Sequence, residues 1–245
     1  MRTTTLAIDA ATARLTVALR ADGRTSELHL DGPRRHATEI LAMIDALLGE
    51  HQLAPREVTD VVTGDGPGSF TGLRVASAVA KALVWGRPDI RWYTAPSLLA
   101  RAVAQLPDDS TEATTVLALS DALRGELFAG CWRFAAGVVQ RVGPSPRAVT
   151  PEMLAELAPV DLVVGTVPEA LLDQVRQATG REVITGDAAL PSAAALLRLM
   201  DWQGGVAAVA DSAAWQPDYG RPAEAQAVWE RKFGRRLPDP TYHAG

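Results

Sequence analysis

The chain has 245 residues, of which 47% are hydrophobic and 22% are charged, and its formal net charge is −5. This length buries a full core and fits one large domain or two small ones, and the composition is that of a globular protein rather than a disordered one. The negative charge argues against a protein that binds nucleic acid over a broad surface by electrostatics alone.

Cysteine content and the amino-terminal sequence indicate a reducing compartment. Cys131 is the single cysteine, so no internal disulfide forms, and its strand-like surroundings predict a buried, inert thiol. The segment that begins at Met1 lacks the layout of a secretory signal, and no apolar run reaches the roughly 18 residues of a membrane span. We therefore expect a cytoplasmic protein with no membrane contact.

The pattern of the first half predicts a meander followed by helices. Alternating apolar residues predict strands at residues 5–9, 15–19 and 26–30. Helical spacing predicts helices at residues 36–48 and 72–85, with a buried strand at 58–63 between them. A helix that covers one face of a sheet needs only one apolar stripe, and both helices carry small or apolar residues beyond such a stripe. They are therefore either buried on most sides within the domain or packed against a second chain.

The segment that joins the buried strand to the second helix is rich in glycine. Gly66, Gly68 and Gly72 let the backbone adopt positive φ angles or approach a neighbour closely, and either Ser69 or Thr71 can cap the helix. Because helix amino termini attract anions, a structural turn and an anion or nucleotide site are alternatives here. The spacing matches neither the P-loop nor the dinucleotide fingerprint.

Asp9 ends the first strand and is the carboxylate best placed for a metal–phosphate site. Ala10 and Ala11 follow it where a phosphate-binding hairpin needs Gly, Ser or Thr, so an aspartate that caps its own turn is the alternative. No two histidines have the spacing of about three to five residues found in metal-binding pairs, and we expect no metal site.

The second half repeats the order of strands followed by helices. Strands are predicted at residues 115–120, 126–134, 138–142, 161–164 and 182–185, and helices at 168–178, at 191–200 and from Pro151 onward. A loop is expected around Pro144 and Pro146. Two lobes fit this order better than a continuous βαβ array. Four basic residues after Ala225 form a solvated tail or, as the alternative, contact RNA or an acidic partner: Arg231, Lys232, Arg235 and Arg236.

Residues 66–74 resemble the signature segment of the bacterial TsaB (YeaZ) family over their full length. Further matching positions follow in the family's order: Asp9, Thr12, His36, Glu39, Lys81, Asp121, Glu126, Pro217, Tyr219 and Arg221. The resemblance implies an α/β fold of the actin-like ATPase (ribonuclease H-like) type, with two lobes that are each a mixed sheet with helices. The expected division is an amino-terminal lobe at 1–105 completed by about 190–225, a carboxy-terminal lobe at 106–189, and a flexible tail at 226–245.

The resemblance also implies a role in forming threonylcarbamoyladenosine beside the anticodon of tRNA. Family members are non-catalytic scaffold subunits that dimerise with the catalytic TsaD subunit and work with the ATPase TsaE. We accordingly expect no catalytic residue and no cofactor of its own, with ATP and Mg²⁺ belonging to the complex and tRNA reached through it. A homodimer is compatible with the family. The alternative function is an independent nucleotide-dependent enzyme, a kinase or ATPase of the same fold.

The family resemblance implies that the two helices predicted at residues 36–48 and 72–85 lie at a dimer surface. The residues assigned to this partner surface are His36, Glu39, Ile40, Met43, Leu47, Phe70, Arg74, Val75, Ala78, Val79 and Ala82. Ala10 and Ala11 stand where the family has Thr-Ser, which argues against nucleotide binding at the first turn.

Overall fold

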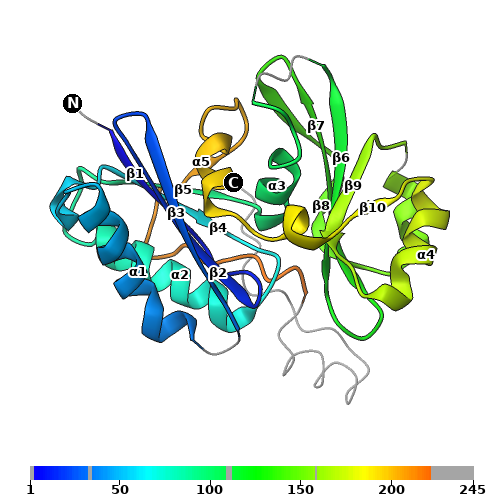
Figure 1. The fold of residues 1–245 in the computed structure, drawn as a ribbon, viewed down its shortest axis with the longest axis horizontal. Coiled ribbons are helices and arrows are strands. Elements are labelled where there is room, and N and C mark those ends of the chain that lie inside the picture. Colours follow the sequence, from blue (N-terminus) through cyan, green and yellow to red (C-terminus); the bar gives the residue numbers. More distant parts are fainter. Residues whose placement is uncertain (1–2, 33–34, 109–111, 158, 222–245) are drawn as a thin grey trace.

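The computed structural model describes residues 3–32, 35–108, 112–157 and 159–221. The predicted tail at 226–245 lies outside these residues. Within the described ranges, no helix is long and apolar enough to cross a membrane. The chain folds into two lobes, each built on a mixed sheet with helices, so the predicted two-lobe α/β architecture is confirmed (Figure 1).

The first sheet begins with the predicted meander and continues with parallel strands. Its elements are, in chain order, β1 (Thr4–Asp9), β2 (Arg14–Ala21), β3 (Arg24–Asp31), α1 (His36–Glu50), the 3-10 turn η1 (Pro55–Glu57), β4 (Asp60–Gly64), α2 (Phe70–Val84), β5 (Arg91–Ala95) and the late strand β11 (Ala207–Ala208). The strand order is β11-β5-β4-β1-β2-β3. β1, β2 and β3 pair antiparallel, whereas β4 and β5 run parallel to β1.

The second sheet follows the same plan. Its elements and the helices around it are α3 (Ser97–Val103), β6 (Thr114–Asp121), β7 (Leu127–Ala135), β8 (Val138–Val149), the 3-10 helix η2 (Pro151–Leu157), β9 (Leu162–Thr166), α4 (Glu169–Thr179), β10 (Val183–Ile184), the 3-10 turn η3 (Gly186–Ala189) and α5 (Ala193–Leu199). The order is β10-β9-β6-β7-β8, with an antiparallel meander β6-β7-β8 and parallel β9 and β10.

Helices and sheets alternate in layers (Figure 1). α1 and α2 cover one face of the first sheet, α3 and α5 lie between the two sheets, and α4 covers the outer face of the second sheet. Strand alternation explains this arrangement, because Leu6 and Ile8 of β1 join the core beneath α1 and α2 while Ala7 joins the core between the sheets. The middle core therefore belongs to both lobes.

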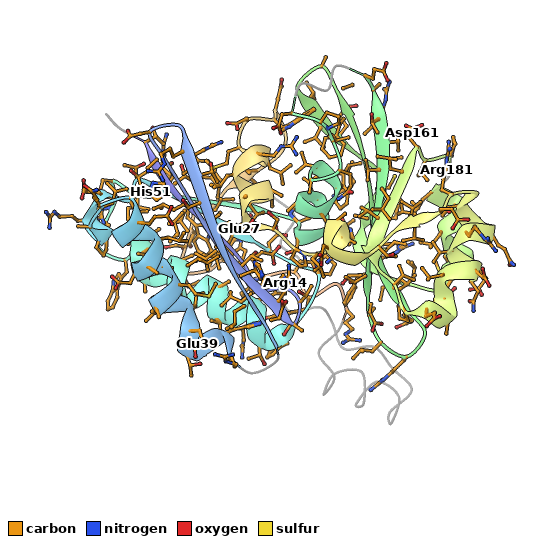
Figure 2. All side chains as sticks on the ribbon, viewed as in Figure 1. Arg14, Glu27, Glu39, His51, Asp161 and Arg181 are labelled. Atoms are coloured by element: carbon orange, nitrogen blue, oxygen red, sulfur yellow. The ribbon has the colours of Figure 1, made fainter. Side chains whose placement is uncertain are left out.

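A carboxylate also connects the first sheet to the middle layer. Glu27 of β3 lies beside α5 (Figure 2), where it accepts hydrogen bonds from the amides of Ala193 and Ala194 and from the hydroxyl of Ser192. The contact satisfies amide groups at the start of α5 that have no partner within the helix.

Two parts of the fold differ from the sequence-based expectation. The loop expected around Pro144 and Pro146 is wrong, since β8 runs through both prolines. Both prolines lie where the β7–β8 register shifts between Ala129 and Cys131, so neither has a pairing partner on β7 and the missing amides cost the sheet no ladder bond. In addition, β5 and α3 were not predicted at all.

Candidate partner face and the loop that positions it

Ser69 begins α2 as its N-cap. Its hydroxyl oxygen accepts a hydrogen bond from the Gly72 amide at 3.2 Å, and its carbonyl oxygen accepts from the Leu73 amide at 2.9 Å. Of the two predicted capping residues, Ser69 holds the position, whereas Thr71 lies within the first turn of the helix.

The three loop glycines are required for different reasons. Gly66 has a φ of +113°, which disfavours any residue with a Cβ. Gly68 and Gly72 have no positive φ, but a Cβ at either position would overlap with the carbonyl oxygen of Ala11 or Ala10 respectively. The loop is thus pressed onto the turn between β1 and β2, and the Ser69 amide donates to the Ala11 carbonyl at 2.7 Å.

Asp9 is held within this junction rather than aimed at an open cleft. The residue is 1% exposed, and its Oδ1 accepts from the Ala11 amide at 2.9 Å and the Ser97 hydroxyl at 3.2 Å. Burial raises the pKa of Asp9, while these two bonds and the charge of Arg101 lower it. Gly64 gives the carboxyl group its space, because a Cβ there would lie 2.9 Å from Asp9 Oδ2.

Three of the amides at this junction have acceptors inside the chain. The Ala11, Ser69 and Gly72 amides donate to Asp9, Ala11 and Ser69 respectively. The anion or nucleotide site at Asp9, Gly66, Gly68, Ser69, Thr71 and Gly72 stays a prediction, and these bonds favour the structural alternative.

Two charged groups near Asp9 lie in unusual environments. Burial, followed by the charges of Asp218 and Asp9, raises the pKa of Asp65 to about 7, against a bond from Thr94. Burial lowers the pKa of Arg101 to about 10. Arg101 reaches from α3 into the second lobe, where it donates to the Leu119 carbonyl and to the Thr166 hydroxyl at 3.1 Å. Neither residue was singled out from the sequence.

Neither the single cysteine nor a metal-binding cluster provides a reactive site among the described residues. Cys131 is buried, and burial raises the pKa of its thiol to about 11, as expected for an inert cysteine. The part of the chain that the structure describes holds no cluster of three or more His, Cys, Asp or Glu residues that could bind a metal ion.

Three residues assigned to the partner surface lie inside the lobe instead. His36, Ile40 and Leu47 are buried between α1 and the first sheet, and His36 Nε2 lies 3.2 Å from the Ala13 carbonyl oxygen. They occupy the apolar stripe by which α1 packs on its own sheet, so they offer no surface to a partner. This assignment is corrected.

The other assigned residues reach solvent to different degrees. Phe70, Arg74, Ala78 and Ala82 are exposed, and they recur every four residues along one side of α2. Four more are partly exposed, two on α1 and two on α2: Glu39, Met43, Val75 and Val79. Glu39 lies near the start of α1 at the end opposite His51 (Figure 2). We call Phe70, Arg74, Ala78, Ala82 and the adjoining Trp85 the α2 face.

Stacked side chains shape the amino-terminal end of the α2 face. The Phe70 ring is 46% exposed, with the Arg74 guanidinium 4.5 Å from its centroid and the Tyr219 ring centred 4.6 Å away. Trp85 at the other end is 87% exposed and was missed from the assignment. Its spacing of three residues from Ala82 continues the row and could have revealed it.

Comparisons with known proteins match this chain over both lobes. The family model described as TsaD, tRNA N6-adenosine threonylcarbamoyltransferase, matches residues 31–157, just over half of the chain. The tRNA threonylcarbamoyladenosine biosynthesis protein TsaB of Bacillus subtilis (strain 168) is 29% identical over 234 residues, which make up 92% of this chain and 97% of that protein. TsaB of Escherichia coli (strain K12) is 36% identical over 124 residues, 50% of this chain and 52% of that protein.

Solved structures give the same picture. YeaZ from Pseudomonas aeruginosa superimposes with a TM-score of 0.66 at 29% identity and covers 81% of this chain and 90% of its own. A structure described as an uncharacterized protein with similarity to the peptidase YeaZ from Pseudomonas aeruginosa has a TM-score of 0.71 at 28% identity and covers 89% of this chain and 100% of its own.

Proposed function

This chain belongs to the TsaB (YeaZ) family, a family of tRNA threonylcarbamoyladenosine biosynthesis, and we propose that it is the non-catalytic scaffold subunit that dimerises with a catalytic TsaD-type subunit. The α2 face is the proposed contact surface. The TsaE-type ATPase and tRNA are then reached through the complex in the cytoplasm, ATP and Mg²⁺ belong to the complex, and the chain needs no cofactor of its own.

The single observation that carries the proposal is the outward side of α2. The helix buries Leu73, Ala76 and Ala80 against its own sheet, so the opposite side is not needed for the lobe's core. That side nevertheless carries a phenylalanine, two alanines and a tryptophan, with Arg74 as its single charge. Small residues let a second helix approach closely, and exposed aromatic and arginine side chains are typical anchors of protein interfaces.

The non-catalytic part of the proposal is supported by the junction around Asp9. The carboxylate that an actin-like enzyme would use is buried and bonded to Ala11 and Ser97, and the amides of Ala11, Ser69 and Gly72 donate to acceptors within the chain. Calorimetry of the isolated chain with ATP and Mg²⁺ tests this point. Micromolar binding with turnover would overturn it in favour of an independent ATPase or kinase.

A charge placed on the α2 face tests the contact. We expect Ala82→Arg to lower the affinity for the cognate TsaD-type subunit at least about tenfold, because a large charged side chain separates closely packed helices. Ala170→Arg is the matched control, since Ala170 is also an exposed helical alanine but lies on α4 in the second lobe. Titration calorimetry gives the affinities, and circular dichroism checks that both variants fold.

Each outcome has a distinct meaning. Equal affinity for both variants would remove the α2 face as the contact surface. No complex with the wild-type chain, together with unchanged tRNA modification when this chain is omitted, would overturn the proposed function. Light scattering of the chain alone and with its partner shows whether the chain also forms a homodimer, and Ala82→Arg shows whether that homodimer uses the α2 face.

A further inference from the structure

Residues 217–221 run between the two lobes, and we call them the strap. On the side of the first lobe, the Asp218 amide donates to the Asp65 carbonyl at 2.8 Å. Gly66 leaves no room for a Cβ because the Asp218 carbonyl oxygen occupies that space. The strap therefore follows the backbone of the loop that leads into α2.

The other end of the strap is bonded to the second lobe. The Arg221 guanidinium donates to the Ala122 carbonyl at 2.7 Å, just after β6, and lies 5.6 Å from the centroid of the Phe128 ring in β7. The Ala148 amide of β8 donates to the Gly220 carbonyl at 3.3 Å. These contacts come from three different strands or their ends.

Gly220 is the point where the two sets of contacts meet. Its φ is +68°, and a Cβ would overlap with the Pro67 side chain and lie 2.9 Å from the Phe128 ring. Pro67 belongs to the loop before α2 and Phe128 to the second lobe, so Gly220 is packed between the lobes. The Gly220 amide also donates to Asp218 Oδ1 at 2.8 Å, which fixes the turn within the strap.

The middle of the strap contacts the α2 face. Tyr219 stacks on Phe70, which in turn carries Arg74. We propose that the strap couples the second lobe to the first turn of α2, with Arg221 as a positioning residue that never touches that turn. The coupling itself does not depend on the proposed function. Its consequence does, namely that contacts in the second lobe change the affinity of the α2 face for a partner.

Hydrogen exchange on the full chain tests the coupling without a partner. The Ser69 and Leu73 amides are hydrogen-bonded at the loop and the first turn of α2, and no contact with Arg221 is involved. We expect Arg221→Ala to raise their exchange rates about tenfold, because the strap loses its charge-assisted bond to the second lobe. Arg221→Lys, which keeps the charge and a donor, restores part of the protection.

Arg141→Ala is the matched control, an exposed arginine of β8 in the same lobe. An exchange increase confined to the second lobe, or equal effects of Arg221→Ala and Arg141→Ala at Ser69 and Leu73, would overturn the coupling. With the TsaD-type partner added, Arg221→Ala is expected to weaken binding several-fold. If the wild-type chain binds no such partner, the proposed function fails, while the exchange comparison still decides the role of the strap.

Discussion

Gly72 lies where the first turn of α2 crosses the turn between β1 and β2, and its missing side chain is what lets the two backbones touch. We expect Gly72→Ala to lower the free energy of unfolding by about 1–3 kcal/mol, since the new methyl group displaces either the helix or the Ala10 carbonyl. Gly49→Ala is the control, because Gly49 lies in α1 with nothing within 4 Å of an added Cβ. Urea unfolding gives both values, and equal midpoints would contradict the crowding.

Asp65 makes stability depend on pH in a defined direction. Its pKa in the folded chain is about 7, above the ordinary aspartate value that applies when the chain is unfolded. The folded chain therefore binds the proton more tightly, and the contribution of Asp65 to stability falls as pH rises from about 4 to 7. Asp9 and Asp218 supply the negative charges that face it, and Thr94 the opposing bond.

The test is Asp65→Asn, which keeps the shape and removes the charge. We expect this variant to be more stable than the wild-type chain at pH 8 by at least about 1 kcal/mol, roughly the value of one pKa unit, and to lose that advantage near pH 3.5, below the unfolded pKa. Thermal unfolding at both pH values measures the effect. Asp45→Asn, at an exposed position of α1, should show no such pH-dependent gain.

At the scale of elements, the sequence predicted correctly those strands and helices whose formation depends on residues close together in the chain. The strands of the meander were predicted from short runs of strand-forming residues separated by polar turns, although β1 and β2 are buried on both faces and β3 is mostly exposed. α1, α2 and α4 show the 3.6-residue period of half-buried helices. α3 was invisible because every residue from Leu98 to Val103 is buried, which leaves no polar stripe to reveal the period. The path of β8 through two prolines depends on a register shift against β7, which no local window of the sequence contains.

In the candidate site, too, features that depend on nearby residues could be predicted and features that depend on distant contacts could not. The Ser69 cap and the crowded glycines follow from residues close in sequence. Arg101 and Asp65 depend on contacts with residues far away in the chain, so the sequence around them gives no signal. Tyr219 and Arg221 of the strap match the family, but the match does not reveal what they contact. The wrong assignments His36, Ile40 and Leu47 arose because an apolar helical residue has the same pattern whether it faces its own sheet or a partner.

Trp85 gives a test of the α2 face at the end that was missed. The side chain is 87% exposed, so Trp85→Ala should change the free energy of unfolding by less than about 0.5 kcal/mol. If the α2 face meets a partner, the same change should lower affinity at least about tenfold, as for an aromatic anchor. Met153→Ala, in the second lobe and also exposed, should leave both quantities near wild type. Full affinity of Trp85→Ala would place the contact toward Phe70 instead.

At the scale of the whole molecule, the two lobes share one core. α3 and α5 pack against the inner faces of both sheets, and Arg101 extends from α3 to Leu119 and Thr166 of the second sheet. Neither sheet can lose this layer without exposing apolar surface of the other. We therefore expect the lobes to unfold together rather than in sequence.

Leu98→Ala tests this shared core. Leu98 of α3 is buried in the middle layer, so truncation should lower the free energy of unfolding by about 2–5 kcal/mol while keeping a single transition. Circular dichroism and tryptophan fluorescence should report the same midpoint. Leu41→Ala, at a leucine of α1 that is 65% exposed, is the control and should cost little. Two separated transitions would show that the lobes are independent.

The crowding around Gly66, Gly68 and Gly72 has a consequence for how relatives of this chain diverge. Backbone atoms of Asp218, Ala11 and Ala10 fill the space beside these glycines, whatever protein the chain meets. These positions should therefore remain glycine in every relative with this junction, even one that has lost its partner. Ala78, Ala82 and Trp85 are exposed in the part of the chain that the structure describes, so their identities should change in step with the surface of the partner. The three glycines therefore identify the fold, whereas the residues of the α2 face should differ between relatives that bind different partners.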